Sequence, residues 1–155
     1  MVIYLVQHGK ALDKSVDPER GLSAEGIKEI KSIALQAQTA GIKVSSILHS
    51  GKLRAEQTAE LYASALDVRQ VQTVEGIQPK DNVAEFINTH QLQDKSMLVG
   101  HLPFMQKLAS CLVNGNEENK VIQFQNGGIV CLEQDQSGQW YIKWTLMTTL
   151  LDHSE

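Results

Sequence analysis

Residues 4–12, YLVQHGKAL, run from β-favouring apolar residues directly into Gln7, His8 and Gly9. Such an apolar run is typical of a buried strand, and a glycine commonly marks its end. The pattern therefore places His8 at the point where a buried strand gives way to a loop. The side chain is either a reactive group held at the end of the sheet or a histidine whose ring is hydrogen-bonded locally.

Outward from this strand, segments with strand and helix patterns alternate along the chain. Strands are expected over residues 2–7, 45–49, 96–99, 121–124, 128–133 and 139–147, with a short edge strand over 69–73. Helices are expected over residues 23–41, 53–66, 82–87 and 102–113, and residues 10–21 form a polar loop. This order predicts an α/β fold, a three-layer α/β/α sandwich with a mostly parallel central sheet. The turn DQSG, residues 135–138, joins antiparallel C-terminal strands, in which Trp140 and Trp144 are expected to share one face.

The composition is that of an ordinary globular protein. The 155 residues are 42% hydrophobic and 21% charged and predict a single domain over residues 1–155. A net charge of −4 argues against nucleic-acid binding. Cys111 and Cys131 form no C-x-x-C pair and fit free thiols in a reducing compartment, which predicts a cytoplasmic location. No apolar run has the length of a membrane span, and the N-terminus lacks the basic-then-apolar order of a signal peptide.

Three chemically useful side chains follow strands that lie far apart in the sequence. His8 ends the first strand, Arg54 lies just after the strand over 45–49, and His101 follows the strand over 96–99. In open α/β sheets, sites form beyond the carboxyl ends of the strands, so the three are expected at one edge. Each has a plainer alternative, because Arg54 can pair with a glutamate on its own helix and His101 can cap the next helix.

Four segments together resemble one family. LVQHGKA (5–11) is similar to the Arg-His-Gly motif of the histidine phosphatase superfamily, the phosphoglycerate-mutase-like enzymes. SSILHSGKLRAEQTAELY (45–62) and MLVGHLP (97–103) are similar to its arginine and second-histidine segments. DPERGLSAEG (17–26) matches a stretch typical of the small SixA-type phosphohistidine phosphatases. The resemblance implies the fold predicted above, without the large lid insertions of the mutases.

The resemblance also implies roles for the residues at the sheet edge. His8 would be the nucleophile that forms a phosphohistidine enzyme intermediate, and a neutral imidazole suits this role near pH 7. Arg54 would bind two phosphate oxygens, and His101 would stabilise charge on the transferring phosphoryl group. Gln7 and Gly9 would complete the phosphate site. No cofactor is expected, and the spacing of histidines and acids predicts no metal site.

Gln7 departs from the family pattern, which has arginine at this position. An amide still donates two hydrogen bonds, but neutral bonds are about half as strong as charge-assisted ones. Lys10 is a candidate source of replacement charge. If Gln7 prevents turnover, the chain is a catalytically silent module that binds phosphate or phosphohistidine.

The substrate is predicted from the leaving group. Glu75 and Asp81 are the available general acids, and neither is clearly placed. Phosphohistidine leaves as neutral imidazole and needs less help from an acid than a phosphate monoester does. A phosphohistidine on a partner protein, such as a phosphorelay or phosphotransferase carrier domain, is therefore favoured over a small phosphorylated substrate. The chain is short for a mutase. Arg20 either reaches the site or anchors its loop by pairing with Asp17 or Glu25.

Overall fold

The structure, a computed structural model, describes residues 1–148. Its strands are β1 (Val2–Gln7), β2 (Ser46–His49), β3 (Val71–Thr73), β4 (Ser96–Gly100), β5 (Ile129–Gln134) and β6 (Trp140–Leu146). Its helices are α1 (Ala24–Thr39), α2 (Leu53–Leu66), α3 (Val83–Thr89) and α4 (Phe104–Asn114). The Ser23 hydroxyl accepts a hydrogen bond from the Gly26 N–H and so caps α1, as its residue type predicts.

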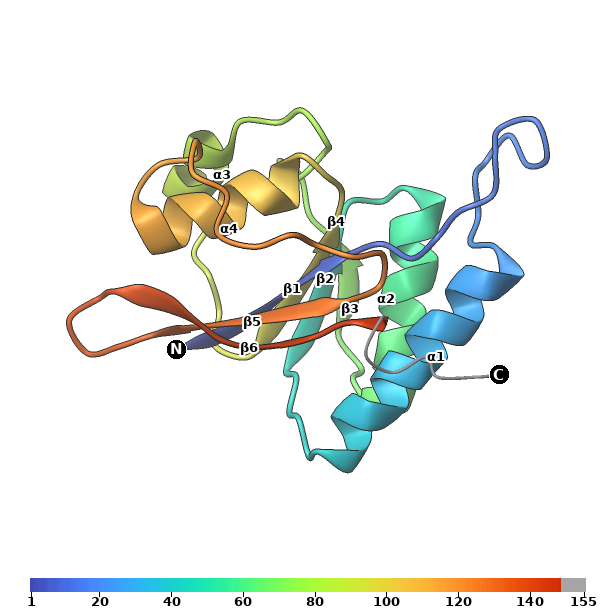
Figure 1. The fold of residues 1–155 in the computed structure, drawn as a ribbon, viewed down its shortest axis with the longest axis horizontal. Helices are drawn as coiled ribbons and strands as arrows, with labels where there is room; N and C mark the ends of the chain where they lie inside the picture. The colour runs from blue at the N-terminus through green and yellow to red at the C-terminus, as the bar shows by residue number, and fades with distance from the viewer. Residues whose placement is uncertain (149–155) are drawn as a thin grey trace.

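The six strands form one sheet in the order β3-β2-β4-β1-β5-β6. β1, β2, β3 and β4 are parallel to their neighbours among these four, whereas β5 runs antiparallel to both β1 and β6. Figure 1 shows α1 and α2 on one side of the sheet and α3 and α4 on the other. The predicted three-layer sandwich with antiparallel C-terminal strands is confirmed, and no large insertion interrupts it.

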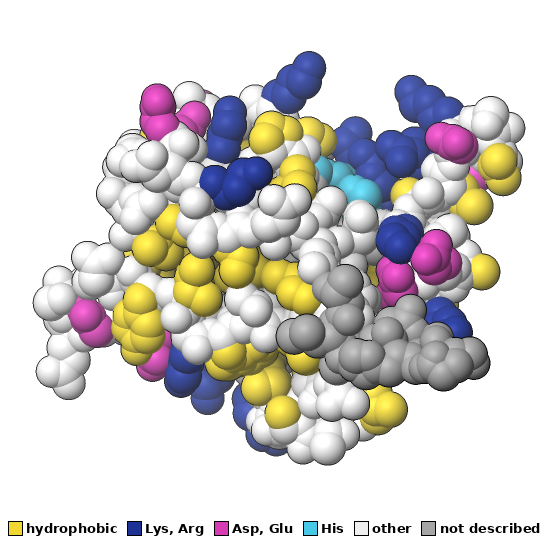
Figure 2. All heavy atoms as spheres, viewed as in Figure 1, with side chains coloured by type: hydrophobic (Ala, Val, Ile, Leu, Met, Phe, Trp, Pro, Cys, Tyr) yellow, Lys and Arg dark blue, Asp and Glu magenta, His cyan; other side chains and the backbone are white. Residues whose placement is uncertain are grey.

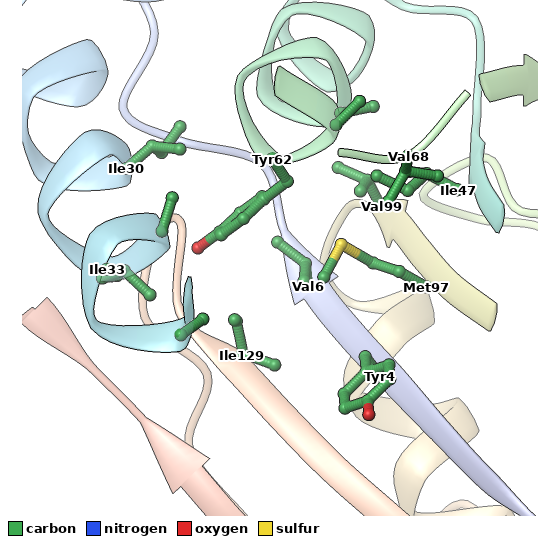
Figure 3. Packing of buried hydrophobic residues seen from close by; sticks show 14 of the residues in the cluster. Tyr4, Val6, Ile30, Ile33, Ile47, Tyr62, Val68, Met97, Val99 and Ile129 are labelled. Atoms are coloured by element: carbon green, nitrogen blue, oxygen red, sulfur yellow. The ribbon is translucent and has the colours of Figure 1, made fainter. Parts of the chain in front are cut away.

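Each face of the sheet buries its own hydrophobic cluster. On the α1/α2 face, Tyr62 reaches from α2 toward Ile33 of α1 and Ile129 of β5 (Figure 3). On the α3/α4 face, strand residues such as Leu5 and Leu98 pack against Phe104 and other residues of the helices. Alternation along each strand sends successive side chains into opposite clusters. Because the strands bury side chains on both faces, their pairing register is fixed, and the carboxyl ends of β1, β2 and β4 are aligned.

The strand expected over residues 121–124 is wrong. This segment packs Phe124 into the α3/α4-side cluster but joins no ladder, and only Asn126 forms an isolated bridge to Gln7. β1, to which Asn126 bridges, is already paired with β4 on one side and with β5 on the other, so it has no free side for this segment. Apolar side chains here serve packing without strand pairing.

The expectation that Trp140 and Trp144 share a face is also wrong. Trp140 packs in the α3/α4-side cluster, whereas Trp144 packs against the opposite cluster with its ring 5.9 Å from that of Tyr4. Cys131 pairs with Trp144 and Leu132 pairs with Ile142, so the register skips Lys143. This β-bulge shifts the alternation by one residue and sends the two tryptophans to opposite sides.

Cys131 is buried and Cys111 half-buried, and both are free thiols, as predicted. Among residues 1–148, the helices lack the length and apolar character needed to cross a membrane.

Candidate active site

The carboxyl ends of three neighbouring parallel strands bring the predicted residues together. β4 lies between β1 and β2, so His8, Ser50 and His101 leave the sheet side by side. The ring centroids of His8 and His101 are 5.0 Å apart. Nε of Arg54 lies 3.3 Å from Nε2 of His8. In Figure 2, the visible histidine side chains lie in a recess at the top of the molecule, next to a group of lysine and arginine side chains.

The hydrogen bonds of His8 fix its tautomer. Nδ1 lies 2.7 Å from the carbonyl oxygen of Gly9, which can only accept, so Nδ1 carries the proton. Nε2 is then unprotonated and accepts the hydrogen bond from Arg54 Nε. Burial lowers the pKa of His8 to about 4, with Arg54 and Arg20 also lowering it and the Gly9 bond opposing them. The imidazole is therefore neutral near pH 7, the form a nucleophile requires.

His101 is 2% exposed and is oriented by Ser50. The Ser50 hydroxyl lies 2.6 Å from Nε2, while the buried Nδ1 has no hydrogen-bond partner among the described residues. Burial is the main cause that lowers the pKa of His101 to about 3, and the charges of Arg54 and Lys52 contribute. If Ser50 donates to Nε2, Nδ1 carries a proton that an anion can accept. A neutral hydrogen-bond donor is the role that this environment favours.

Thr58 joins helix α2 to the loop that follows His8. Its buried hydroxyl donates to the carbonyl oxygen of Arg54 and accepts from the Gly9 N–H at 2.9 Å. The Gly9 amide, predicted to approach phosphate, is thus engaged within the protein. A Cβ at Gly9 would overlap Cδ1 of Ile30, so a larger residue here would force the buried Ile30 side chain to shift. These contacts set the distance between His8 and Arg54.

The main chain of Gln7 and His8 is held from the other side. Asn126 Nδ2 donates to the carbonyl oxygen of His8, and the Gly127 N–H donates to that of Gln7. The Tyr62 hydroxyl donates a hydrogen bond to the carbonyl oxygen of Gly127, which ties this segment to α2. Within residues 1–148, the half-buried side-chain amide of Gln7 makes no hydrogen bond to the protein.

The structure shows which partners Arg20 and Lys10 have, the two basic residues whose roles the sequence left undecided. Arg20 donates from Nε to the carbonyl oxygen of Leu12, 3.1 Å away, and makes no ion pair within the described part of the chain. It thus anchors the loop through backbone, and its charge still lowers the pKa of His8. Lys10 Nζ pairs with Glu25 at 3.0 Å and Glu29 at 3.1 Å. The Lys10 ammonium is therefore held at the surface of α1 by two ion pairs.

The two candidate acids line a cavity whose lining does not include His8, Arg54 or His101. Glu75 and Asp81 line a separate cavity with Glu85, Thr89 and His90. Asp81 accepts a hydrogen bond from the Gln78 N–H, and Gln78 Nε2 donates to the carbonyl oxygen of Ser50. The loop that was expected to supply a general acid therefore places the side-chain amide of Gln78 against Ser50. Residues 1–148 contain no cluster of three or more His, Cys, Asp or Glu arranged to hold a metal ion.

Residue types alone did not single out Ser50, Thr58 and Gln57 as site residues. Gln57 Oε1 accepts from the Leu22 N–H at 2.7 Å, so the Gln-Thr pair of α2 holds both ends of the loop between β1 and α1. A signal was present in the sequence, because buried polar residues just after a strand end and on an inward helix face need partners.

Comparisons with known proteins agree with the geometry. An uncharacterised protein of Picosynechococcus sp. (strain ATCC 27264 / PCC 7002 / PR-6) is 29% identical over 85% of this chain and 84% of its own. Phosphohistidine phosphatase SixA of Escherichia coli (strain K12) is 24% identical over 94% and 93%. A solved structure of the protein histidine phosphatase SixA complexed with tungstate superposes with a TM-score of 0.79 at 25% identity, over 98% of this chain and 100% of that one. No family model matches the chain.

Similarity therefore extends over nearly the whole chain in both sequence and fold. By both measures, the chain resembles the SixA-type phosphohistidine phosphatases of the histidine phosphatase superfamily, as its four motifs predict.

Proposed function

We propose that this protein is a phosphatase that uses His8 as its nucleophile and dephosphorylates phosphohistidine on a partner protein. The observation that carries the proposal is the unprotonated Nε2 of His8, held 3.3 Å from Nε of Arg54. A nucleophile and a cation for phosphate oxygens meet there at one point. The similarity to proteins called phosphohistidine phosphatases supports the same reaction.

The reaction has two steps. Nε2 of His8 attacks phosphorus in line with the leaving nitrogen, forming an N–P bond as the substrate's P–N bond breaks, and the substrate imidazole leaves with a proton on its ring. Water then attacks the phosphorus on His8 and releases inorganic phosphate, with His8 regaining its neutral state. Arg54 and the Nδ1 proton of His101 stabilise the charge on the phosphoryl oxygens in both steps.

The surroundings of the site favour an imidazole leaving group. Within residues 1–148, Arg54, His8 and His101 make no ion pair or hydrogen bond with a carboxylate. A phosphate monoester needs a nearby acid more than phosphohistidine does. The expected substrate is a phosphorelay or phosphotransferase carrier domain, and a small phosphorylated substrate is the weaker choice.

The free cysteines fit a reducing compartment, and we expect the protein to lie in the cytoplasm.

Gln7 favours a second candidate function. Without the arginine of the resembled family, the site can bind a phosphorylated partner and fail to turn it over. The protein would then be a phosphohistidine-binding module.

Phosphate release separates the two functions. The protein is mixed with a carrier protein phosphorylated on histidine and, in parallel, with a phosphoserine peptide. We expect inorganic phosphate from the phosphohistidine protein only, and none from His8→Ala. Saturable binding of the phosphorylated carrier without phosphate release would establish the binding module and contradict the phosphatase.

A further inference from the structure

Lys52 occupies the N-cap position of α2, where lysine is an unfavourable residue. Its side chain makes no capping hydrogen bond, and Arg54 follows two residues later. N-caps favour Ser, Thr, Asp or Asn, and the positive end of the helix dipole repels cations. Two cations therefore lie in the first turn of a 14-residue helix against its dipole. An anion bound beside this turn would relieve the repulsion.

The Lys52 ammonium is available to such an anion. The residue is exposed, and its side chain makes no ion pair with another described residue. Lys10, the other candidate for replacement charge, is held by Glu25 and Glu29. Of these two lysines, only Lys52 makes no ion pair with a described carboxylate.

The backbone of Lys52 is also linked to His101 through Ser50. Its N–H donates to Ser50 Oγ at 3.3 Å, and the same oxygen contacts His101 Nε2 at 2.6 Å. His101 is 98% buried, and its Nδ1 lacks a partner among residues 1–148. The charge of Lys52 reaches this ring, since it contributes to the lowered pKa of His101.

Gln7, where the resembled family has arginine, lies at the end of β1, the strand next to β4. Side chains two apart in a strand share a face, so Gln7 lies on the face of Ile3 and Leu5, toward α3 and α4. Gln7 pairs in register with Gly100, the residue before His101. The site thus lacks its family cation at the end of β1, and Lys52 adds a positive charge at the start of α2.

We propose that Lys52 is a further cation of the phosphate site beside Arg54, binding a phosphoryl oxygen next to His101. This inference rests on the proposed phosphate site and identifies how a chain with Gln7 holds its substrate. A lysine is a point charge on a flexible stem and lacks the two-pronged geometry of arginine. It therefore contributes similar binding in the ground state and the transition state, so its loss raises KM more than it lowers kcat.

The test compares orthovanadate binding and steady-state kinetics in matched variants. Lys52→Met is expected to weaken orthovanadate binding about tenfold and to raise KM by a similar factor, with kcat within about twofold, whereas Lys10→Met changes neither. Gln7→Arg is expected to restore tight binding to Lys52→Met. Lys52→Ser supplies a good N-cap, so it should raise the melting temperature while weakening binding, which excludes misfolding as the cause.

The outcomes separate this inference from the proposed function. If the wild type binds orthovanadate but releases no phosphate from the phosphohistidine protein, the phosphatase proposal fails. Orthovanadate binding by the lysine variants then still tests Lys52. If the wild type turns over and Lys52→Met binds orthovanadate as tightly as wild type, the Lys52 proposal is overturned alone. Equal losses in Lys52→Met and Lys10→Met also overturn it, because they indicate a general charge effect. Absence of orthovanadate binding by the wild type overturns both.

Discussion

Nε of Arg54 donates a hydrogen bond across 3.3 Å to the unprotonated Nε2 of His8. The unprotonated Nε2 of His8 and the cation of Arg54 therefore meet at one place. Thr58 holds this geometry by linking the Arg54 carbonyl to the Gly9 amide. The site is organised by contacts within the folded chain, and these contacts lead to testable consequences.

The pH dependence of activity follows from the state of His8. Its pKa, lowered by burial to about 4, leaves the ring neutral throughout the neutral range. We expect protonation of His8 to leave kcat/KM unchanged from about pH 6 to 8 and to lower it only as the pH approaches 4. Because the phosphohistidine ring of the substrate titrates as well, the test follows the His8 ring signal of the free protein by NMR, with circular dichroism to confirm folding at each pH. Titration of His8 near 6.5, the ordinary histidine value, would contradict it.

Stability should also depend on pH through His101. Its pKa is about 3 in the folded protein, below the ordinary 6.5, so the unfolded chain binds more protons between these values. Stability is fully present above about pH 6.5 and is lost as the pH falls toward 3. Between pH 7 and 4.5, the wild type should lose about 2 kcal/mol more unfolding free energy than His101→Asn, which lacks this titration. Urea denaturation at both pH values measures the difference, and equal losses would contradict the assignment.

Ser50 is predicted to act as a positioning residue for His101. Ser50→Ala removes the hydroxyl 2.6 Å from Nε2 and leaves both ring nitrogens without a protein partner. We expect kcat/KM to fall about tenfold, since an unsatisfied buried polar group costs about 1–3 kcal/mol. Ser110→Ala is the matched control, because that buried hydroxyl already has no partner among the described residues. Unchanged kinetics in Ser50→Ala, with the His101 titration also unmoved, would refute the role.

The close approach of Gly9 to Ile30 can be measured as a coupling. Gly9→Ala would place its Cβ against Ile30 Cδ1 and should cost about 1–3 kcal/mol of stability. Ile30→Val removes that methyl group, so Gly9→Ala should cost less in the Ile30→Val background. Unfolding free energies of the two single variants and the double variant test this. Strict additivity would show that another contact makes glycine necessary.

Much of the fold could be predicted from the sequence because burial on two faces leaves clear patterns. The apolar runs of β1 and β4 and the periodicity of α2 define those elements, and α2 begins and ends as predicted at Leu53 and Leu66. Segment 121–124 has equally apolar residues, but β1, to which the nearby Asn126 bridges, is paired on both sides. Pairing is a property of the whole sheet, so local composition cannot reveal it. The bulge at Lys143, which separates Trp140 from Trp144, is a similar case.

The candidate site was predictable where it depends on strand ends and not where it depends on side-chain pairing. His8, Arg54 and His101 meet because parallel strands end at a common edge. Lys10 also follows β1, yet it pairs with two carboxylates of α1, Glu25 and Glu29, and not with a group of the site. Which partner a long, charged side chain takes depends on packing between elements that the sequence places far apart.

The central claim is that His8 carries the phosphoryl group during turnover. The most direct measurement mixes the protein with a ³²P-labelled phosphohistidine carrier protein and quenches within milliseconds in acid or in base. We predict label on the enzyme that is lost in acid, survives in base, is absent from His8→Ala and is retained in the control His90→Ala. An enzyme that releases phosphate without ever carrying this label, or that carries it equally in His8→Ala, would contradict the account.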